Sequence, residues 1–178
     1  MTLSFDSCGG SGRFRGTLDG FGLTDRMDVH DEYAPEETFA DCLSHFPQAC
    51  VEVVVAHEGG VVLARRVNDP AAGEWFWPGS RLYKGERLVD AARRIASEEL
   101  GLSVTVERRL GVHEHFWERS SVAGADSRHT VNVVFLVRPV DGLDVALDSQ
   151  HDDWRLVHEA TDRYHEYVRE YVESHDLF

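Results

Sequence analysis

Basic residues are scarce in this chain. Of its 178 residues, 18 are lysine or arginine and 32 are aspartate or glutamate, which gives a formal net charge of −14. Binding to a nucleic-acid backbone depends on clustered cations, so this balance argues against nucleic acid as a partner. A phosphorylated small molecule would need a local basic pocket or a bound metal ion.

Long apolar runs and cysteines are also scarce. No apolar stretch approaches the ~20 residues that span a bilayer, and no basic stretch followed by an apolar one opens the sequence. The three cysteines are odd in number and lack Cys-x-x-Cys spacing, which argues against a disulfide framework and a zinc cage: Cys8, Cys42 and Cys50. We therefore expect a soluble cytoplasmic protein with no membrane partner.

Lysine is almost missing, since Lys84 is the only one and every other basic side chain is arginine. An acidic surface with so little lysine is typical of a protein kept soluble in concentrated salt, where charge repulsion is strongly screened. We therefore expect a halophilic protein. Genomic base composition that favours arginine over lysine is the alternative explanation.

The chain divides into two regions of different composition. Residues 1–33 contain the run Gly9-Gly10-Ser11-Gly12 and little apolar periodicity. This region is expected to be a flexible arm, or a non-native leader from a misjudged start codon, since Met27 could start the chain instead. Residues 34–178 are expected to form one domain with a single core.

Apolar periodicity predicts strands mixed with helices over residues 34–178. Pro35, followed by Glu36 and Glu37, predicts a short helix that ends before Pro47. The other expected elements are strands at 51–55 and 61–63 around a hairpin at Gly59-Gly60, a loop at 68–78, a helix at 88–101, strands at 104–108, 111–117, 130–137 and 154–157, and a helix at about 160–173. This order predicts the α/β class, with a mixed β-sheet sandwiched between helices.

The clearest helix, over residues 88–101, carries two adjacent carboxylates in its last turn. Its apolar residues recur at helical spacing: Leu88, Ala91, Ala92 and Ile95. Glu98 and Glu99 lie at the negative end of the helix dipole, where a carboxylate costs free energy unless it meets a cation. Arg94, four residues before Glu98, has the weaker orientation for an ion pair. A divalent metal such as Mg²⁺ would resolve this conflict, and a solvated face is the simpler alternative.

Two further features have both a functional and a structural interpretation. His151 follows Gln150 in a polar turn; its imidazole suits proton transfer near neutral pH, although a histidine in such a turn is more often simply solvated. Gln150 offers a neutral oxygen to a metal. The rings of Trp75, Phe76 and Trp77 could stack on a nucleobase, but large aromatic residues before a helix more often pack into the core.

The stretch from Ser80 to Leu102 resembles the Nudix box, Gly-x5-Glu-x7-Arg-Glu-apolar-x-Glu-Glu-x-Gly-apolar. The matching positions are Glu86, Arg94, Ala96, Glu98, Glu99, Gly101 and Leu102. The resemblance implies the Nudix fold and a hydrolase that depends on Mg²⁺, or alternatively Mn²⁺. Ser80 departs from the first glycine, and Ile95 from the first glutamate of the helix. In many Nudix pyrophosphohydrolases that glutamate helps to activate water or binds a metal, and Ile95 can do neither.

Within this family the chain is most similar to the GDP-mannose mannosyl hydrolases, from about Glu36 to Val172. The similar segments are Phe39 and Pro47, residues 63–68 and 75–81, the altered box, residues 111–117, and Gln150-His151-Asp152-Asp153. That branch also lacks the box glutamate and cleaves the bond between the anomeric carbon and the diphosphate, with inversion. The similarity implies a nucleoside diphosphate sugar as substrate, nucleoside diphosphate and free sugar as products, and a homodimer.

The same resemblance implies a role for each candidate residue. The metal would be held by the Gly79 carbonyl, Glu99 and Gln150, with His151 as the general base. Arginines would hold the diphosphate or neutralise it during catalysis: Arg66, Arg81 and Arg94. Polar groups would surround the sugar: Glu52 and His115. Two residues depart from the branch: Glu98 keeps a more ordinary metal site open, and Thr130 replaces a tyrosine near the leaving group.

The sequence leaves two other functions open. One is a pyrophosphohydrolase that cuts between phosphates, with Glu98 and Glu99 on the metal. The other is a non-catalytic domain that binds a nucleotide as a sensor, which the loss of the box glutamate at Ile95 would allow.

Overall fold

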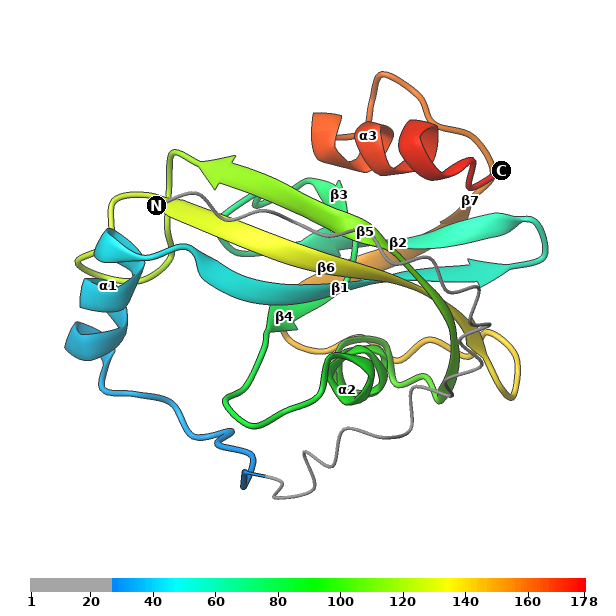
Figure 1. Ribbon diagram of the computed structural model, residues 1–178. Helices are drawn as coiled ribbons and strands as arrows, with labels where there is room; N and C mark the ends of the chain where they lie inside the picture. Colours follow the sequence, from blue (N-terminus) through cyan, green and yellow to red (C-terminus); the bar gives the residue numbers. More distant parts are fainter. Residues whose placement is uncertain (1–26) are drawn as a thin grey trace, which may run out of the picture.

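A computed structural model describes residues 27–178 of the chain (Figure 1). Most of the predicted extension, residues 1–26, therefore lies outside the described residues. Residues 27–35 run toward the first helix on the side of the sheet where α2 (Leu88–Leu100) lies, and His30 N donates a hydrogen bond to Lys84 O at 2.9 Å. This part of the predicted extension thus contacts the folded domain.

The fold is built on a mixed sheet, as predicted, and this sheet has seven strands. The strands are β1 (Gln48–His57), β2 (Gly60–Arg66), β3 (Trp75–Phe76), β4 (Gly79–Arg81), β5 (Val104–Trp117), β6 (Arg128–Pro139) and β7 (His151–Val157). Their order is β3-β2-β1-β6-β5, while β4 pairs with β1 and β7 pairs with β2. The β1–β6 pair is parallel, and the other pairs are antiparallel.

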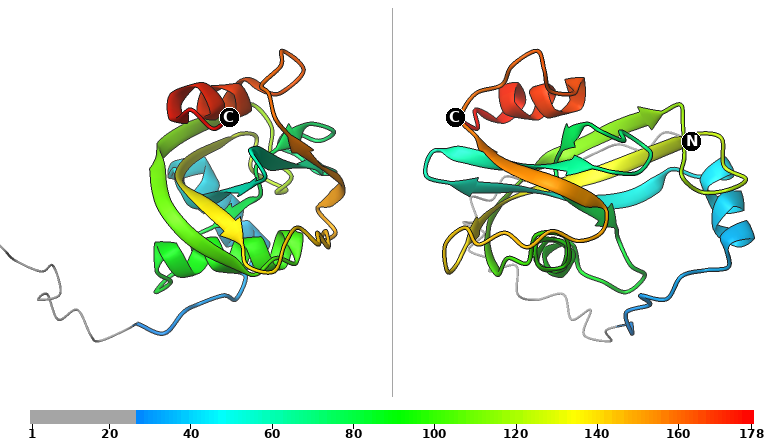
Figure 2. Two further views of the ribbon diagram at one scale, coloured as in Figure 1. Left: turned by 90° about the vertical axis from the view of Figure 1, so that its right-hand side faces the viewer. Right: turned by 180° about the vertical axis from the view of Figure 1, so that it is seen from behind.

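Helices cover both faces of this sheet, which confirms the expected α/β class. The helices are α1 (Glu36–His45), α2 (Leu88–Leu100) and α3 (Glu166–His175). Figures 1 and 2 show α2 and α3 on opposite sides of the sheet, with α1 beyond one end. No helix in the described part of the chain is both long and apolar enough to cross a membrane.

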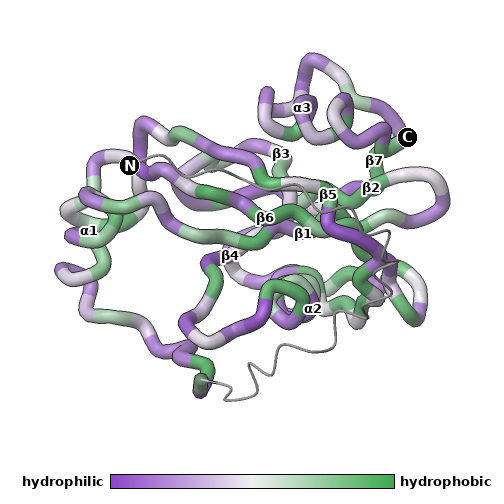
Figure 3. The backbone as a smooth tube through the Cα atoms, in the orientation of Figure 1, coloured by the Kyte–Doolittle hydropathy of each residue, from purple (hydrophilic) through white to green (hydrophobic). Residues whose placement is uncertain are grey.

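The two larger hydrophobic clusters of the core lie on opposite sides of the sheet, and a small third cluster packs α1 against Ala125. On β1, Val53 and Val55 pack into the cluster that includes α2, while Val54 packs into the cluster that includes α3. Hydrophobic residues accordingly gather along the middle of β1 and β6 (Figure 3). A strand covered on both faces needs a nearly continuous apolar run, which explains the sequence Val-Glu-Val-Val-Val at 51–55.

The helix that carries the altered Nudix box forms as predicted. Ile95 is fully buried in the α2 cluster, so it serves as a core residue. Gly101 ends the helix in the left-handed conformation (φ 68°), and its N–H donates to Ser97 O at 3.1 Å. A Cβ at Gly101 would lie 2.9 Å from that of Ala146, so glycine is required here for space as well as for backbone conformation.

Several predicted boundaries were wrong. The two strands expected at 104–108 and 111–117 are one strand, β5, because bulges near Val106 and Arg109 let it continue along β6. The predicted loop at 68–78 contains the short strand β3. The closing helix begins at Glu166 rather than near 160, because the His165 side chain caps it by accepting a bond from Tyr167 N. The last strand begins three residues early, at His151.

Candidate active site

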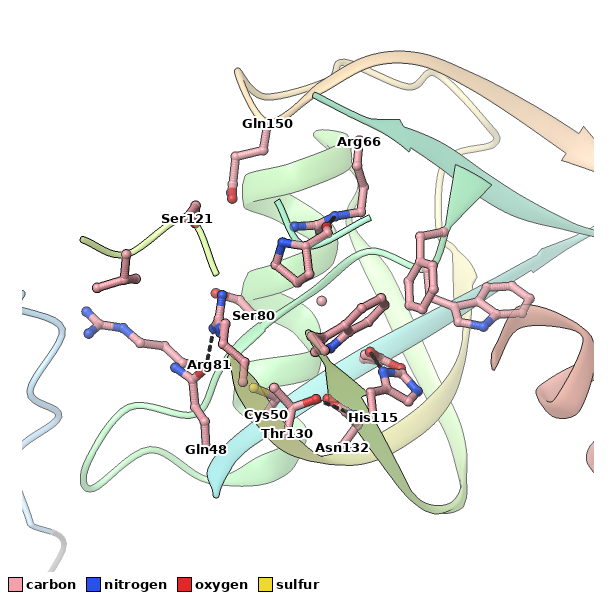
Figure 4. Close-up of a pocket in the computed structure, with 18 of the residues that line it drawn as sticks. Gln48, Cys50, Arg66, Ser80, Arg81, His115, Ser121, Thr130, Asn132 and Gln150 are labelled. Carbon is pink, nitrogen blue, oxygen red and sulfur yellow. Dashed lines mark hydrogen bonds and ion pairs between the residues drawn. The ribbon is translucent and has the colours of Figure 1, made fainter. Parts of the chain in front are cut away.

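A cavity of about 220 Å³ opens between β1, β4, β6 and the loop after β2 (Figure 4). Alternate residues of two neighbouring parallel strands form part of its wall, since side chains two apart lie on one face of a strand. These residues are Gln48, Cys50 and Glu52 from β1, and Arg128, Thr130 and Asn132 from β6. Gly79, Ser80 and Arg81 of β4 complete this side.

One end of the cavity holds a buried hydrogen-bond network. The Tyr171 hydroxyl, from α3, donates to Glu52 Oε2 at 2.6 Å, and Nε2 of His115 lies 3.0 Å from the same hydroxyl oxygen. Nδ1 of His115 faces Glu52 Oε1 at 3.5 Å. Where the Tyr171 proton is donated to Glu52, the contact with His115 requires a proton on Nε2 of the imidazole, because the tyrosine hydroxyl has one proton to donate.

Burial makes this network uncharged. It raises the pKa of Glu52 to about 8, and it lowers the pKa of His115 to about 3. At neutral pH the carboxyl therefore holds a proton and the imidazole does not. Two neutral groups that both donate and accept hydrogen bonds suit a polyhydroxylated ligand rather than an ion.

Three groups predicted to hold the metal meet beside the cavity. Gly79 N donates to Glu99 Oε2 at 3.0 Å, and Glu99 is only 3% exposed. Burial, with the nearby Asp148 as a smaller cause, raises the pKa of Glu99 to about 8. Gln150 lines the same cavity as Gly79, and its side chain points into it (Figure 4).

These donors fit a divalent cation. Carbonyl, amide and carboxylate oxygens are the ligands that Mg²⁺ prefers. A buried carboxylate without a cation beside it is costly, and a divalent ion would favour its charged form. Gly79 has to be a glycine, because a Cβ there would lie 2.6 Å from Glu52 Cγ. Among the described residues, no group of three or more acidic, histidine or cysteine side chains is placed to hold a metal ion.

Glu98 points away from this group. Its carboxylate accepts a bond from Arg94 at 2.9 Å, and its side chain is 55% exposed. Arg94 also donates to both oxygens of Glu86, at 2.7 and 2.9 Å, and to the carbonyl of Arg81. All the hydrogen bonds of Arg94 go to Glu86, to Glu98 and to the Arg81 carbonyl, so the structure favours a structural role for this ion-pair network.

His151 is buried rather than solvated. Its Nδ1 lies 2.8 Å from Asp148 Oδ1, and its Nε2 is enclosed without a partner. Burial lowers the pKa of His151, while the bond to Asp148 acts in the opposite direction. The imidazole does not line the cavity itself, but it follows Gln150, which does, and it faces Arg66 in the β2–β7 pairing.

Three arginines line the cavity of this acidic protein. Arg66 stands at a bulge between β2 and β7, and its Nε donates to Pro70 O at 2.8 Å. Arg81 stacks over the Tyr33 ring, 4.2 Å from its centroid. Arg128 bonds Gln48, and its Nε is buried without a partner. The cavity wall is therefore cationic where a diphosphate would lie.

The family of the chain follows from its sequence as well as from this geometry. A sequence model of the NUDIX domain matches residues 46–172. The chain belongs to the Nudix family. As a Nudix hydrolase it acts on a nucleotide derivative, and such hydrolases generally use a divalent metal such as Mg²⁺.

Similar proteins support this assignment. The chain is 40% identical over 142 residues to "Low-salt glycan biosynthesis protein Agl8" of Haloferax volcanii, which covers 80% of this chain and 90% of that protein. It is 29% identical over 97 residues to an ADP-ribose pyrophosphatase of Methanocaldococcus jannaschii, over 54% and 53% of the two chains. A MutT protein of Methanosarcina mazei Go1 shares the fold, with a TM-score of 0.62 and 22% identity over 74% of this chain and 95% of that one.

The structure places three residues in or beside the cavity that the sequence analysis did not identify. Tyr171 reaches Glu52 across 119 residues of sequence, so no local pattern could have revealed it. Arg128 gave no signal besides its charge. Asp148 stands three residues before His151, and this spacing was the one available clue. Phe76 and Trp77 are buried, which confirms their core role, although both also border the cavity.

Glu99 and Glu98 should respond differently to the loss of charge. We expect Glu99→Gln to raise the Mg²⁺ concentration needed for half-maximal activity at least about tenfold, because it removes a buried anionic ligand. Glu98→Gln is the matched control, and we expect little change, because this side chain is exposed and paired with Arg94. Titration of activity with Mg²⁺ measures both; equal effects would contradict the assignment of Glu99.

Glu52 should make the fold less stable as the pH rises. Its pKa is about 8 in the folded chain against 4.5 for a free side chain, so the folded state holds the proton more tightly. The contribution of Glu52 to the free energy of unfolding is then complete below pH 4.5. It declines between pH 4.5 and pH 8 by at most about 1.4 kcal/mol per pH unit. Urea unfolding in EDTA at pH 5, 6.5 and 8 should show a steeper decline for the wild type than for Glu52→Gln. Parallel pH profiles would contradict a protonated Glu52.

Proposed function

We propose that this Nudix protein is a Mg²⁺-dependent hydrolase of nucleoside diphosphate sugars, of the GDP-mannose type, that attacks the anomeric carbon. Two facts taken together carry the proposal: Ile95 is buried and cannot act as a base, and His151 is held in a fixed orientation by Asp148. The helix position that carries a glutamate in many pyrophosphohydrolases is part of the core here. A histidine held by Asp148, with its second nitrogen unpartnered, offers a base elsewhere.

In the proposed reaction, separate groups of residues would bind the diphosphate, the metal ion and the sugar. Arg66 and Arg128 hold the diphosphate, and their charge neutralises the departing oxygen as the bond to the sugar breaks. Glu99, the Gly79 carbonyl and Gln150 would hold Mg²⁺, which, when bound, supplies further neutralisation of the diphosphate. Glu52, His115 and Asn132 form the enclosed polar end, and they accept and donate hydrogen bonds to sugar hydroxyls.

His151 would take the proton from the attacking water. Asp148 holds Nδ1, which keeps the proton of a neutral imidazole on that atom and leaves Nε2 as the acceptor. Burial lowers the pKa of His151, so it is neutral and competent near pH 7. A water activated on the face of the sugar opposite the diphosphate gives inversion, as in an inverting glycosidase.

The relatives support the setting of this activity. The Haloferax volcanii relative is a low-salt glycan biosynthesis protein, and nucleotide sugars are donors for glycan synthesis. The acidic composition with one lysine agrees with a protein that works in concentrated salt. A cytoplasmic location and a homodimer, both expected in the sequence analysis, stay predictions.

A second function, cleavage between phosphates, is favoured by two observations. Glu98 and Glu99 are both present at the end of α2, and one relative is an ADP-ribose pyrophosphatase. Its products would be a sugar phosphate and a nucleoside monophosphate. The third candidate function, which the loss of the box glutamate at Ile95 allows, is a sensor that binds a nucleotide without hydrolysing it. Measurable hydrolysis would exclude the sensor and leave the two enzymatic functions.

Hydrolysis in ¹⁸O-labelled water tests the site of attack. We expect the label in the free sugar and none in the nucleoside diphosphate, because water attacks carbon in the proposed reaction. Mass spectrometry of both products, with GDP-mannose as substrate and Mg²⁺ in molar salt, gives the answer. Label on phosphate would replace the proposal by the pyrophosphohydrolase, and binding without turnover would favour the sensor.

Removal of the base should affect turnover more than metal binding. We expect His151→Ala to lower kcat about 10²–10⁴-fold, because the water loses its proton acceptor, while the Mg²⁺ response changes little. His45→Ala, at an exposed histidine of α1 outside the cavity, serves as the control. Circular dichroism and thermal unfolding verify that each variant folds. Unchanged kcat in a folded His151→Ala variant would remove this residue from the mechanism.

A further inference from the structure

One aromatic residue of the cavity comes from outside the Nudix match. Tyr33 lines the cavity, yet it precedes α1 and the family match begins only at residue 46. It is 82% exposed, so its ring contributes little to the core. An exposed tyrosine at the edge of a substrate cavity calls for an explanation other than packing.

Specific contacts hold Tyr33 in place. The guanidinium of Arg81 lies over its ring, 4.2 Å from the centroid, and donates hydrogen bonds to the carbonyls of Asp31 and Glu32 at 3.3 Å each. The backbone contact of His30 with Lys84 ties the same segment to the chain after β4. One face of the ring is thus covered by a cation, and the exposed area is left for a ligand.

The two ends of the cavity differ in chemistry. His115 and Asn132 lie at one end, and Ser121 and Arg81 lie at the other (Figure 4). The first end is enclosed and polar, with Glu52 and His115 nearly inaccessible to solvent. At the other end, Tyr33 and Phe39 flank the Arg81 guanidinium, whose distance to the Phe39 ring centroid is 6.0 Å. Flat apolar faces at an open end suit a planar, aromatic group.

We propose that Tyr33 is the stacking platform for the nucleobase of the substrate, which places the base at the Arg81 end and the sugar at the Glu52 end. The inference rests on the proposed function for its nucleoside diphosphate ligand, but it does not depend on which bond is cleaved. Arg81 then acts on the base subsite by holding the Tyr33 segment, in addition to any contact with phosphate. A residue from outside the matched domain would determine affinity for the base.

Binding of GDP and of inorganic pyrophosphate by the full chain separates the base from the phosphates. We expect Tyr33→Ala to weaken GDP binding about tenfold or more, because an aromatic platform supplies much of the affinity for a base, and to leave pyrophosphate binding unchanged. Tyr33→Phe should retain GDP affinity, since the ring remains. Phe46→Ala, at an aromatic residue 68% exposed outside this cavity, is the matched control. Isothermal titration calorimetry with Mg²⁺ measures all of these.

Each contrary result has a distinct meaning. Unchanged GDP affinity in Tyr33→Ala overturns the base platform, and so does a wild type that binds GDP no more tightly than pyrophosphate. Equal weakening of GDP and pyrophosphate, or a fall in Tm, overturns it as well, because Tyr33 would then act only through Arg81 or the fold. If the labelled-water experiment instead places attack on phosphorus, the proposed function fails while the GDP result still decides the role of Tyr33.

Discussion

The buried carboxylate of Glu99 at the end of α2 is the constraint on which the site depends. Glu99 follows Ile95 by one helical turn, so the helix face that packs into the core also places this carboxylate inside the protein. One backbone donor, the Gly79 N–H, is its hydrogen-bond partner, which is too little to offset desolvation and leaves the pKa at about 8. A cation at this position would remove the conflict, and Gly79 and Gln150 in the cavity wall would offer it further oxygens.

The neighbouring glutamate shows why position on the helix matters more than residue type. Glu98 is rotated by about 100° from Glu99, which takes it out to solvent and to Arg94. Arg94 in turn satisfies Glu86 with two bonds and holds the chain between β4 and α2 through the Arg81 carbonyl. The box residues thus divide into a buried carboxylate, Glu99, and an ion-pair group that holds the loop before the helix.

The sequence predicted most of the elements because their signals are local. The apolar stripe at 88–95 and Gly101 located α2, and the valine run located β1. The network of Glu52, His115 and Tyr171 could not be predicted, because three elements distant in the sequence meet only after folding. Burial of His151 was also missed, because the strand begins three residues earlier than expected and its pairing with β2 buries the first residue, His151, while Asp152 and Asp153 stay exposed. The bulges of β5 likewise depend on its pairing with β6, which a single sequence does not show.

Charge distribution explains how an acidic protein can take an anionic substrate. The net charge of −14 is spread over the chain, but the cavity combines Arg66, Arg81 and Arg128 with carboxyls that burial keeps protonated. Glu52 and Glu99 without a metal therefore add little negative potential to the cavity in which we propose that the diphosphate binds. A divalent ion held by Glu99 would favour the charged carboxylate, and the two positive charges of the ion would exceed the one negative charge of Glu99. The local field thus remains attractive to phosphate in both states, while the outer surface keeps the repulsion that favours solubility.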